Sequence, residues 1–195
     1  PFIYQGDELG MTNYPFSRIE EFDDIEVKNA WKADVLTGKV PADEFIWHLL
    51  RTSRDHSRTP MQWNDSPHGG FTISAMPWLA VNPNYKEINA KQAQTDPDSI
   101  YNYFKNVIGL RKKTPALIYG DYQDLDPASP VIFAYTRTLG TDRYLIVLNF
   151  SNGDVAYSLP DDLKAGQLVI SNVASNEENV SRVNLKAWEA RIYRA

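Results

Sequence analysis

The spacing of apolar residues changes from a helical to a strand-like period near Pro115. Before it, apolar side chains recur on one helix face in three segments. The first is Ile25 to Lys32, the second is Asp43 to about Arg51, and the third follows Asp96-Pro97, a pair that suits an N-cap and the first helical position. Thr114-Pro115 ends the third segment. The residues expected to face inward are Phe45, Ile46, Leu49 and Leu50 in the second helix and Ile100, Phe104, Val107, Ile108 and Arg111 in the third.

After Pro115, short β-rich runs alternate with turn residues, which predicts about six strands. The runs are 131–137, 144–150, 155–159, 168–170, 180–185 and 190–193. The stretch Leu139–Asp142 signals a hairpin, and Asn152-Gly153 is the dipeptide favoured in two-residue hairpin turns. Strands at this density indicate an antiparallel β-sandwich.

Two further stretches depart from this pattern. Residues 2–5 are β-branched and aromatic, and no turn or cap precedes them, so we expect a strand already under way and a chain that is a fragment. Residues 57–89 hold four prolines, a glycine pair and two tryptophans. Such a composition predicts a long irregular loop, and long ordered loops are often functional.

The composition of the chain limits the classes of partner that it is expected to bind. Its 195 residues are 43% hydrophobic and 23% charged, as in soluble globular proteins of one or two domains. The net charge is −5 and no basic block occurs, so neither nucleic acid nor an anionic membrane is an expected partner. The absence of cysteine excludes disulfides and thiolate metal sites and favours the cytoplasm.

Among the groups that could carry chemistry, only carboxylates remain. There is no G-x-S-x-G turn, and the three histidines are not at metal-ligand spacing. Asp7-Glu8 follows the expected strand, and Asp23, Asp24 and Glu26 lie close together. Paired carboxylates can hydrolyse glycosides, although most acidic clusters are solvated surfaces.

The segment Ser53–Trp63 is more unusual, because it combines two arginines with an aspartate and a tryptophan. Arginine offers a planar fork of donors to neighbouring hydroxyls, and Trp63 and Trp78 could offer flat faces to a sugar ring. The competing interpretation, favoured from chemistry alone, is that the arginines pair with Asp55 or Asp65 and the tryptophans fill a core.

Several blocks in order resemble α-glucosidases of the α-amylase clan, most closely the oligo-1,6-glucosidases and dextran glucosidases. The blocks are Phe2–Asn13, Phe22–Asn29, Arg54–Trp63, Val81–Asn89 and Leu110–Lys113. The resemblance implies the terminal part of a (β/α)₈ barrel followed by a C-terminal antiparallel β-sandwich, an α/β plus all-β fold class. It makes residues 1–114 the last strand, loop and helices of the incomplete barrel, and 115–195 the sandwich.

The resemblance also implies a retaining mechanism whose nucleophile, acid/base and third carboxylate all lie upstream of residues 2–5. No catalytic residue is therefore expected in this chain, and Asp7, Glu8 and Glu26 are not assigned as such. No cofactor and no metal are implied.

Two substrate contacts follow from the resemblance. Arg54 matches an arginine that binds hydroxyls of the terminal glucose, and Glu26 matches a glutamate lining the neighbouring site for the leaving sugar. Arg58 is expected to brace the loop, whereas Tyr4 and Gln5 are expected to pack in the barrel.

The resemblance implies a cytoplasmic exo-α-glucosidase that cleaves α-1,6 bonds of isomalto-oligosaccharides or dextran ends, with this fragment inactive alone. Trehalose-phosphate hydrolases and sucrose isomerases share the same blocks, so these two activities stay open. Two hypotheses of a different class also stay open. One is a non-catalytic sugar-binding or assembly module, to which Tyr119, Tyr122, Tyr135 and Tyr157 would contribute, and the second is an accessory subunit of a transporter. The incomplete barrel face, with residues 2–5, is expected to pack on the sandwich, on a missing piece or on a second copy.

Overall fold

The computed structural model describes residues 2–195 and contains two compact units. The first extends to Phe104 and the second is Lys105–Ala195, so their boundary falls inside helix α4 (Ile100–Lys113). The domain limits expected from the resemblance, 1–114 for the incomplete barrel and 115–195 for the sandwich, stay a prediction.

The first unit is built of short helices joined by ordered turns. Its α-helices are α1 (Ile25–Ala30), α2 (Ala42–Thr52) and α3 (Ala90–Thr95). A π-helical turn follows α1 (Trp31–Val35), and 3₁₀ turns occur at Asp7–Leu9, Ile19–Glu21, Arg54–Arg58, Pro67–Gly70 and Pro83–Lys86. The first two predicted helices are therefore confirmed, and residues 57–89 form the predicted irregular segment.

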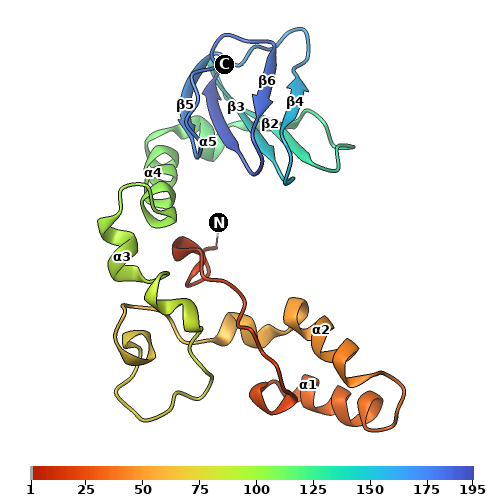
Figure 1. Ribbon diagram of the computed structural model, residues 1–195. Coiled ribbons are helices and arrows are strands. Elements are labelled where there is room, and N and C mark those ends of the chain that lie inside the picture. The colour runs from red at the N-terminus through yellow and green to blue at the C-terminus, as the bar shows by residue number, and fades with distance from the viewer. Residues whose placement is uncertain (1) are drawn as a thin grey trace. The chain divides into compact units, whose positions relative to one another are not determined.

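Helices α1 and α2 lie side by side (Figure 1). They share an apolar cluster. The amphipathic pattern of α2 predicts this packing, because it places the apolar side chains of α2 on one face. The buried members of the cluster are Phe16, Phe22, Val27 and Leu49, with Phe45, Ile46 and Leu50 partly buried around them.

The third helix begins later than predicted. Asp96-Pro97 forms a turn in which the Asp96 carboxylate accepts the amide of Asp98 at 2.9 Å, and α4 starts at Ile100. Ser99 takes the capping role, because its Oγ accepts the amide of Asn102 at 3.2 Å. The prediction that Ile100 faces inward is also wrong, since that side chain is 54% exposed. The end of the helix before Thr114 is confirmed.

The expected strand at residues 2–5 is not formed. A strand needs a neighbour to satisfy its backbone groups, and these residues pair with none of the strands in the described chain. Instead Tyr4 begins a turn, in which its carbonyl oxygen accepts a hydrogen bond from the amide of Asp7 at 3.2 Å. Ile3 and Tyr4 are each about half exposed, at 53% and 52%, so Tyr4 does not pack in a barrel within this chain.

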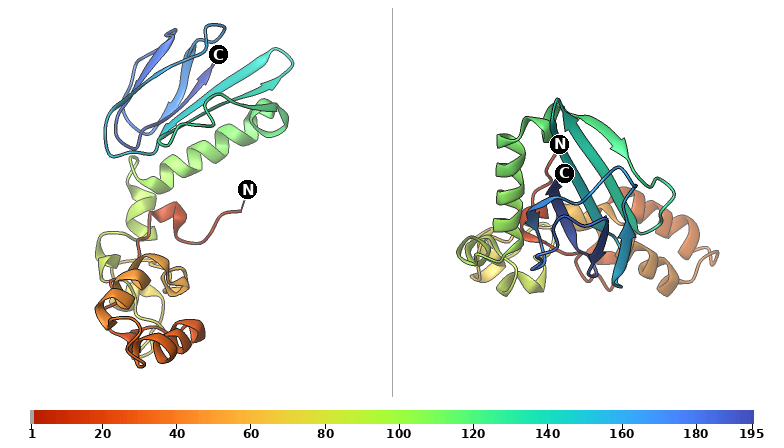
Figure 2. Two further views of the ribbon diagram at one scale, coloured as in Figure 1. Left: turned by 90° about the vertical axis from the view of Figure 1, so that its right-hand side faces the viewer. Right: turned by 90° about the horizontal axis from the view of Figure 1, so that it is seen from above.

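The second unit is an antiparallel β-sandwich (Figure 2). Its strands are β1 (Asp121–Asp124), β2 (Ile132–Leu139), β3 (Asp142–Asn149), β4 (Val155–Ser158), β5 (Gln167–Ser171), β6 (Arg182–Leu185) and β7 (Ala190–Arg194). Five strands form one sheet in the order β1-β2-β3-β7-β5, and β4 pairs with β6 in the other. Both sheets contribute buried side chains to one core, among them Ala134, Leu145, Val147, Val183, Leu185 and Tyr193.

Two details of the sandwich differ from the sequence prediction. The β2–β3 hairpin is confirmed, with Gly140 at φ 59°, but Asn152-Gly153 does not close a hairpin. Strand β4 instead pairs with β6, and the Asn149 side chain bridges the turn by donating to the carbonyls of Gly153 and Lys186 at 2.7 and 2.8 Å. Strand β1 and the short helix α5 (Pro115–Tyr119) were not predicted.

In the part of the chain that the structure describes, none of the helices has the length and apolar character needed to span a bilayer.

Candidate functional site

The unusual motif of the sequence forms the 3₁₀ turn Arg54–Arg58, directly after α2. Ser53 begins the turn, because its Oγ accepts the amide of Asp55 at 3.2 Å. The N-terminal segment fastens it. The amide of Tyr14 donates to His56 Nδ1 at 3.1 Å, so the proton of this imidazole lies on Nε2, which donates to the carbonyl of Leu49 at 3.0 Å.

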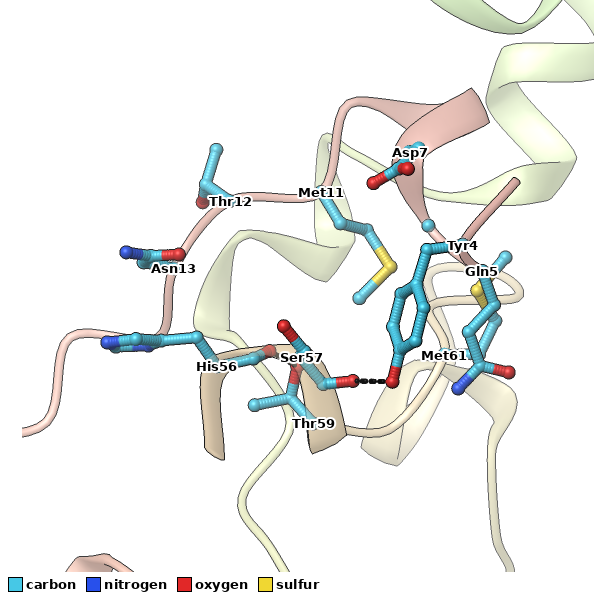
Figure 3. A pocket seen from close by; sticks show the side chains of 11 residues that line it. Tyr4, Gln5, Asp7, Met11, Thr12, Asn13, His56, Ser57, Thr59 and Met61 are labelled. Atoms are coloured by element: carbon cyan, nitrogen blue, oxygen red, sulfur yellow. Dashed lines mark hydrogen bonds between the residues drawn. The ribbon is translucent and has the colours of Figure 1, made fainter. Parts of the chain in front are cut away.

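A small cavity of about 140 Å³ lies between this turn and the N-terminal segment (Figure 3). The hydroxyl of Tyr4 donates to the carbonyl of Ser57 at 2.8 Å at its edge. The sulfur-bearing side chains of Met11 and Met61 and the polar side chains of Thr12 and Thr59 line it as well. The turn that carries Arg54 is thus held by residues far away in the sequence.

Arg54 binds the carboxylate of Asp24 in a two-point contact. Its Nε donates to Asp24 Oδ2 at 2.8 Å and its Nη2 donates to Oδ1 at 3.0 Å. Asp24 is buried at the start of α1, where Oδ1 also accepts the amide of Glu26 at 2.9 Å as an N-cap. Arg54 remains half exposed beside this buried carboxylate.

A second arginine and a second carboxylate complete the cluster. Asp55 is fully buried, and its Oδ2 accepts the amides of Asp23 and Asp24 at 2.7 and 2.9 Å. Arg58 joins the two buried carboxylates, because its Nη1 lies 3.0 Å from Asp24 Oδ2 and 3.1 Å from Asp55 Oδ1. Each buried charge is therefore both paired and hydrogen-bonded.

The charges of the cluster keep Asp24 ionised. The hydrogen bond from Arg54, supported by the Glu26 amide and the charge of Arg58, lowers the pKa of Asp24 to about 2. The same contact raises the pKa of the Arg54 guanidinium above its ordinary value. Asp24 is therefore ionised near neutral pH.

The two predicted site residues lie together. Glu26 Oε2 is 2.8 Å from Arg54 Nη2, and the Glu26 side chain is 76% exposed. Nε and Nη2 of Arg54 donate hydrogen bonds to Asp24, and Nη2 is also paired with Glu26, whereas Nη1 donates no hydrogen bond within residues 2–195. The cluster therefore presents two donors of Nη1 next to an exposed carboxylate. Contact of Arg54 and Glu26 with a sugar stays a prediction.

The competing interpretation of the arginines is correct in part. Arg58 pairs with Asp55 as that interpretation expects, and it also ties the turn to α1, so it braces the loop. Arg54 pairs with neither predicted partner, and Asp65 lies 3.8 Å from Lys91 instead. The two tryptophans do not fill a core in this chain, since Trp63 and Trp78 are 51% and 60% exposed.

Sequence reasoning missed the contact between Asp24 and Arg54, although Asp24 precedes the Ile25 helix in the manner of an N-cap. The other acidic pair, Asp7-Glu8, lies in a separate 3₁₀ turn where Glu8 accepts the amide of Gly6 at 2.9 Å. Among the described residues no set of three or more histidines or carboxylates is arranged to hold a metal ion.

Comparison with known proteins matches the alpha amylase catalytic domain to residues 1–120 and the alpha-amylase SusG C-terminal domain to residues 132–192. The chain is 43% identical over 197 residues to the oligo-1,6-glucosidase of Parageobacillus thermoglucosidasius, covering 100% of this chain and 35% of that protein. A mutant isomaltulose synthase from Erwinia rhapontici NX5, solved with sucrose, is 48% identical with a TM-score of 0.94, again over 100% of this chain and 35% of the other. The trehalulose synthase MutB from Pseudomonas mesoacidophila MX-45 is 45% identical, with a TM-score of 0.94 and the same coverage.

The chain thus spans about a third of the length of the relatives it matches. The matches confirm the predicted fold class, a part of the catalytic barrel followed by a β-sandwich, and the predicted resemblance to oligo-1,6-glucosidases. With a catalytic-domain match over more than half of its residues, this chain belongs to the alpha-amylase family.

Proposed function

We propose that this chain supplies part of the substrate site of a retaining exo-α-glucosidase that hydrolyses α-1,6 bonds of isomalto-oligosaccharides or dextran ends. The contact between Arg54 and Glu26 carries the proposal, because it sets hydrogen-bond donors beside an exposed acceptor. The similarity to a protein named oligo-1,6-glucosidase supports the linkage.

The pair is suited to hydroxyl groups of the two sugars that flank the cleaved bond. Nη1 of Arg54 donates to a hydroxyl oxygen of the terminal glucose, while the carboxylate of Glu26 accepts the proton of a hydroxyl on the leaving sugar. A deoxy sugar leaves one of these polar groups without a partner, which costs binding energy, so the arrangement selects for a substrate that keeps both hydroxyls.

Hydrolysis requires further carboxylates. A retaining glycosidase uses two carboxyl groups about 5–5.5 Å apart, one as nucleophile and one as acid/base. Asp24 and Asp55 are buried, and their oxygens accept hydrogen bonds from arginines and backbone amides, so neither carboxylate is exposed to attack a substrate carbon. The reacting groups therefore come from the rest of the full-length protein.

Kinetics on the full-length protein test this function. With an aryl α-glucoside and with isomaltose, Arg54→Ala should lower kcat/KM about a hundredfold, as expected for a lost charge-assisted contact in a binding site. Arg51→Ala is a matched control, because Arg51 is a nearby surface arginine that stacks on Trp47 at 3.9 Å. This 195-residue chain alone should show no turnover. Turnover by the chain alone, or a full-length protein inactive on both substrates, would contradict the proposal.

A second candidate is a sucrose isomerase, favoured by the 48% and 45% identities to isomaltulose and trehalulose synthases. The two activities differ in their products from sucrose. An isomerase returns a rearranged disaccharide, whereas a hydrolase releases glucose and fructose. Chromatography of the products from the full-length protein separates them.

The sugar-binding module interpretation has one structural feature in its favour. Phe133 and Tyr135 on β2 and Tyr122 on β1 form a row on the outer face of the five-stranded sheet, with ring centroids 5.0 and 5.3 Å apart. Tyr157, which that interpretation includes, is buried in the core. Calorimetric titration of the chain with isomaltose tests the row, and Tyr122→Ala should abolish any binding there.

A further inference from the structure

We propose that Asp24 is a positioning residue for Arg54, a role that rests on the proposed function of Arg54 as a sugar contact. The two-point contact at 2.8 and 3.0 Å fixes both the position and the plane of the guanidinium. Without it, Arg54 is a half-exposed side chain with several rotatable bonds, and holding it still would cost binding energy.

The contact also decides which edge of Arg54 meets the substrate. The single N–H of Nε and one N–H of Nη2 donate to Asp24, and Nη2 also forms an ion pair with Glu26 Oε2 at 2.8 Å. Only the two N–H groups of Nη1 stay available within residues 2–195. Asp24 therefore selects Nη1, together with the carboxylate of Glu26, as the edge that recognises hydroxyl groups.

Asp24 is itself fixed from three directions. Its backbone amide donates to buried Asp55, its Oδ1 caps α1 through the amide of Glu26, and its Oδ2 also contacts Arg58. A carboxylate held this firmly can orient Arg54 without moving when a substrate arrives.

The change Asp24→Asn separates positioning from helix capping. Asparagine caps helices as well as aspartate does, so α1 keeps its N-cap. Its side chain, however, has one acceptor oxygen and an NH₂ group, and the NH₂ would face an N–H donor of Arg54 at about 3 Å. The two-point contact is lost, and the guanidinium turns away from its present plane.

A double-mutant cycle in the full-length protein tests the proposal, with kcat/KM on an aryl α-glucoside for Asp24→Asn, Arg54→Ala and the double variant. We expect a loss of about tenfold for Asp24→Asn, about a hundredfold for Arg54→Ala, and no further loss in the double variant, because Asp24 acts through Arg54. Asp23→Asn is the control, since this neighbouring carboxylate pairs with Lys28 at the surface. Melting temperatures of all variants confirm that the comparison is between folded proteins, and Asp24→Ser, which also caps a helix, replaces a variant that does not fold.

The second readout is substrate discrimination. The unmodified protein should prefer the complete glucoside over analogues lacking one hydroxyl, and Asp24→Asn and Arg54→Ala should lose this preference for the same hydroxyl. A merely structural role would lower kcat/KM equally for all analogues. Losses that multiply in the double variant, or an unchanged preference in Asp24→Asn, would overturn the positioning role. An unchanged kcat/KM in Arg54→Ala would instead overturn the proposed function of Arg54.

Discussion

Replacing Asp24 by asparagine removes the ionised group that joins α1 to the Arg54–Arg58 turn, so it should also change stability in a pH-dependent way. The folded-state pKa of Asp24 is about 2, against an ordinary value of 3.8. Because the folded pKa is lowered, the carboxylate stabilises the fold above its unfolded pKa. This contribution is lost as the pH falls through the folded pKa.

The size of the effect follows from the two values. The difference corresponds to about 2.4 kcal/mol of unfolding free energy at pH 7. Almost all of it, about 2.2 kcal/mol, remains at pH 4, and about 1.3 kcal/mol remains at pH 3. The stability difference between the unmodified chain and Asp24→Asn should therefore be nearly constant from pH 7 to pH 4 and then shrink by about 1 kcal/mol at pH 3.

Urea unfolding followed by circular dichroism measures this difference at each pH. Subtraction of the variant from the unmodified chain cancels the other carboxylates, which titrate in both proteins. Asp23→Asn is the matched control, because its carboxylate pairs with Lys28 with both side chains about half exposed, and it should cost less than about 1 kcal/mol. A stability difference for Asp24→Asn that is the same at pH 3 as at pH 7 would refute the assignment of a selectively stabilised carboxylate.

Three other substitutions have defined outcomes. Arg58→Ala leaves the buried carboxylate of Asp55 without a cationic partner and Asp24 with Arg54 alone, so it should lower the unfolding free energy by about 3 kcal/mol and reduce the melting temperature. Leu145→Ala removes a fully buried side chain of the sandwich core and should cost about 2–5 kcal/mol in urea unfolding. Gly140→Ala should cost about 1 kcal/mol because of its positive φ, whereas Gly153→Ala, in open space at an ordinary φ, should change stability by less than about 0.5 kcal/mol. If calorimetry showed equal effects of the two glycine substitutions, this would contradict the conclusion that Gly140, and not Gly153, occupies a hairpin turn that requires a positive φ.

Local patterns were sufficient where an element buries one face within its own unit. Helix α2 and the β2–β3 hairpin were predicted because their apolar spacing and turn residues agree with their packing. Strand β1, Asp121–Asp124, has no apolar alternation, since it is an edge strand that forms its ladder only with β2. Such a strand is defined by backbone pairing, which leaves little trace in the sequence.

The Asn152-Gly153 prediction failed for a different reason. A turn dipeptide indicates a change of direction but does not say which strand the chain pairs with afterwards. Here the Asn149 side chain supports the turn, and β4 leaves the sheet of β3 to pair with β6. The choice between sheets depends on the whole core, to which Val183 and Leu185 of β6 contribute.

The sequence also does not reveal which residues of the site, far apart along the chain, contact one another. The resemblance placed Glu26 in the block Phe22–Asn29 and Arg54 in the separate block Arg54–Trp63, with nothing in the sequence to connect the two blocks. The structure joins the blocks through Asp24, whose carboxylate accepts from Arg54 while its amide donates to Asp55.

The two blocks are therefore structurally coupled through Asp24. Glu26 follows the α1 cap, Arg54 begins the 3₁₀ turn, and a single buried carboxylate sets their distance. A substitution that shifts α1 should displace Arg54 as well, because the Asp24 carboxylate at the start of α1 holds the guanidinium. Changes in either block should therefore alter the selectivity for a sugar in the same direction. Two independent contacts would contribute separately and would not produce this common response.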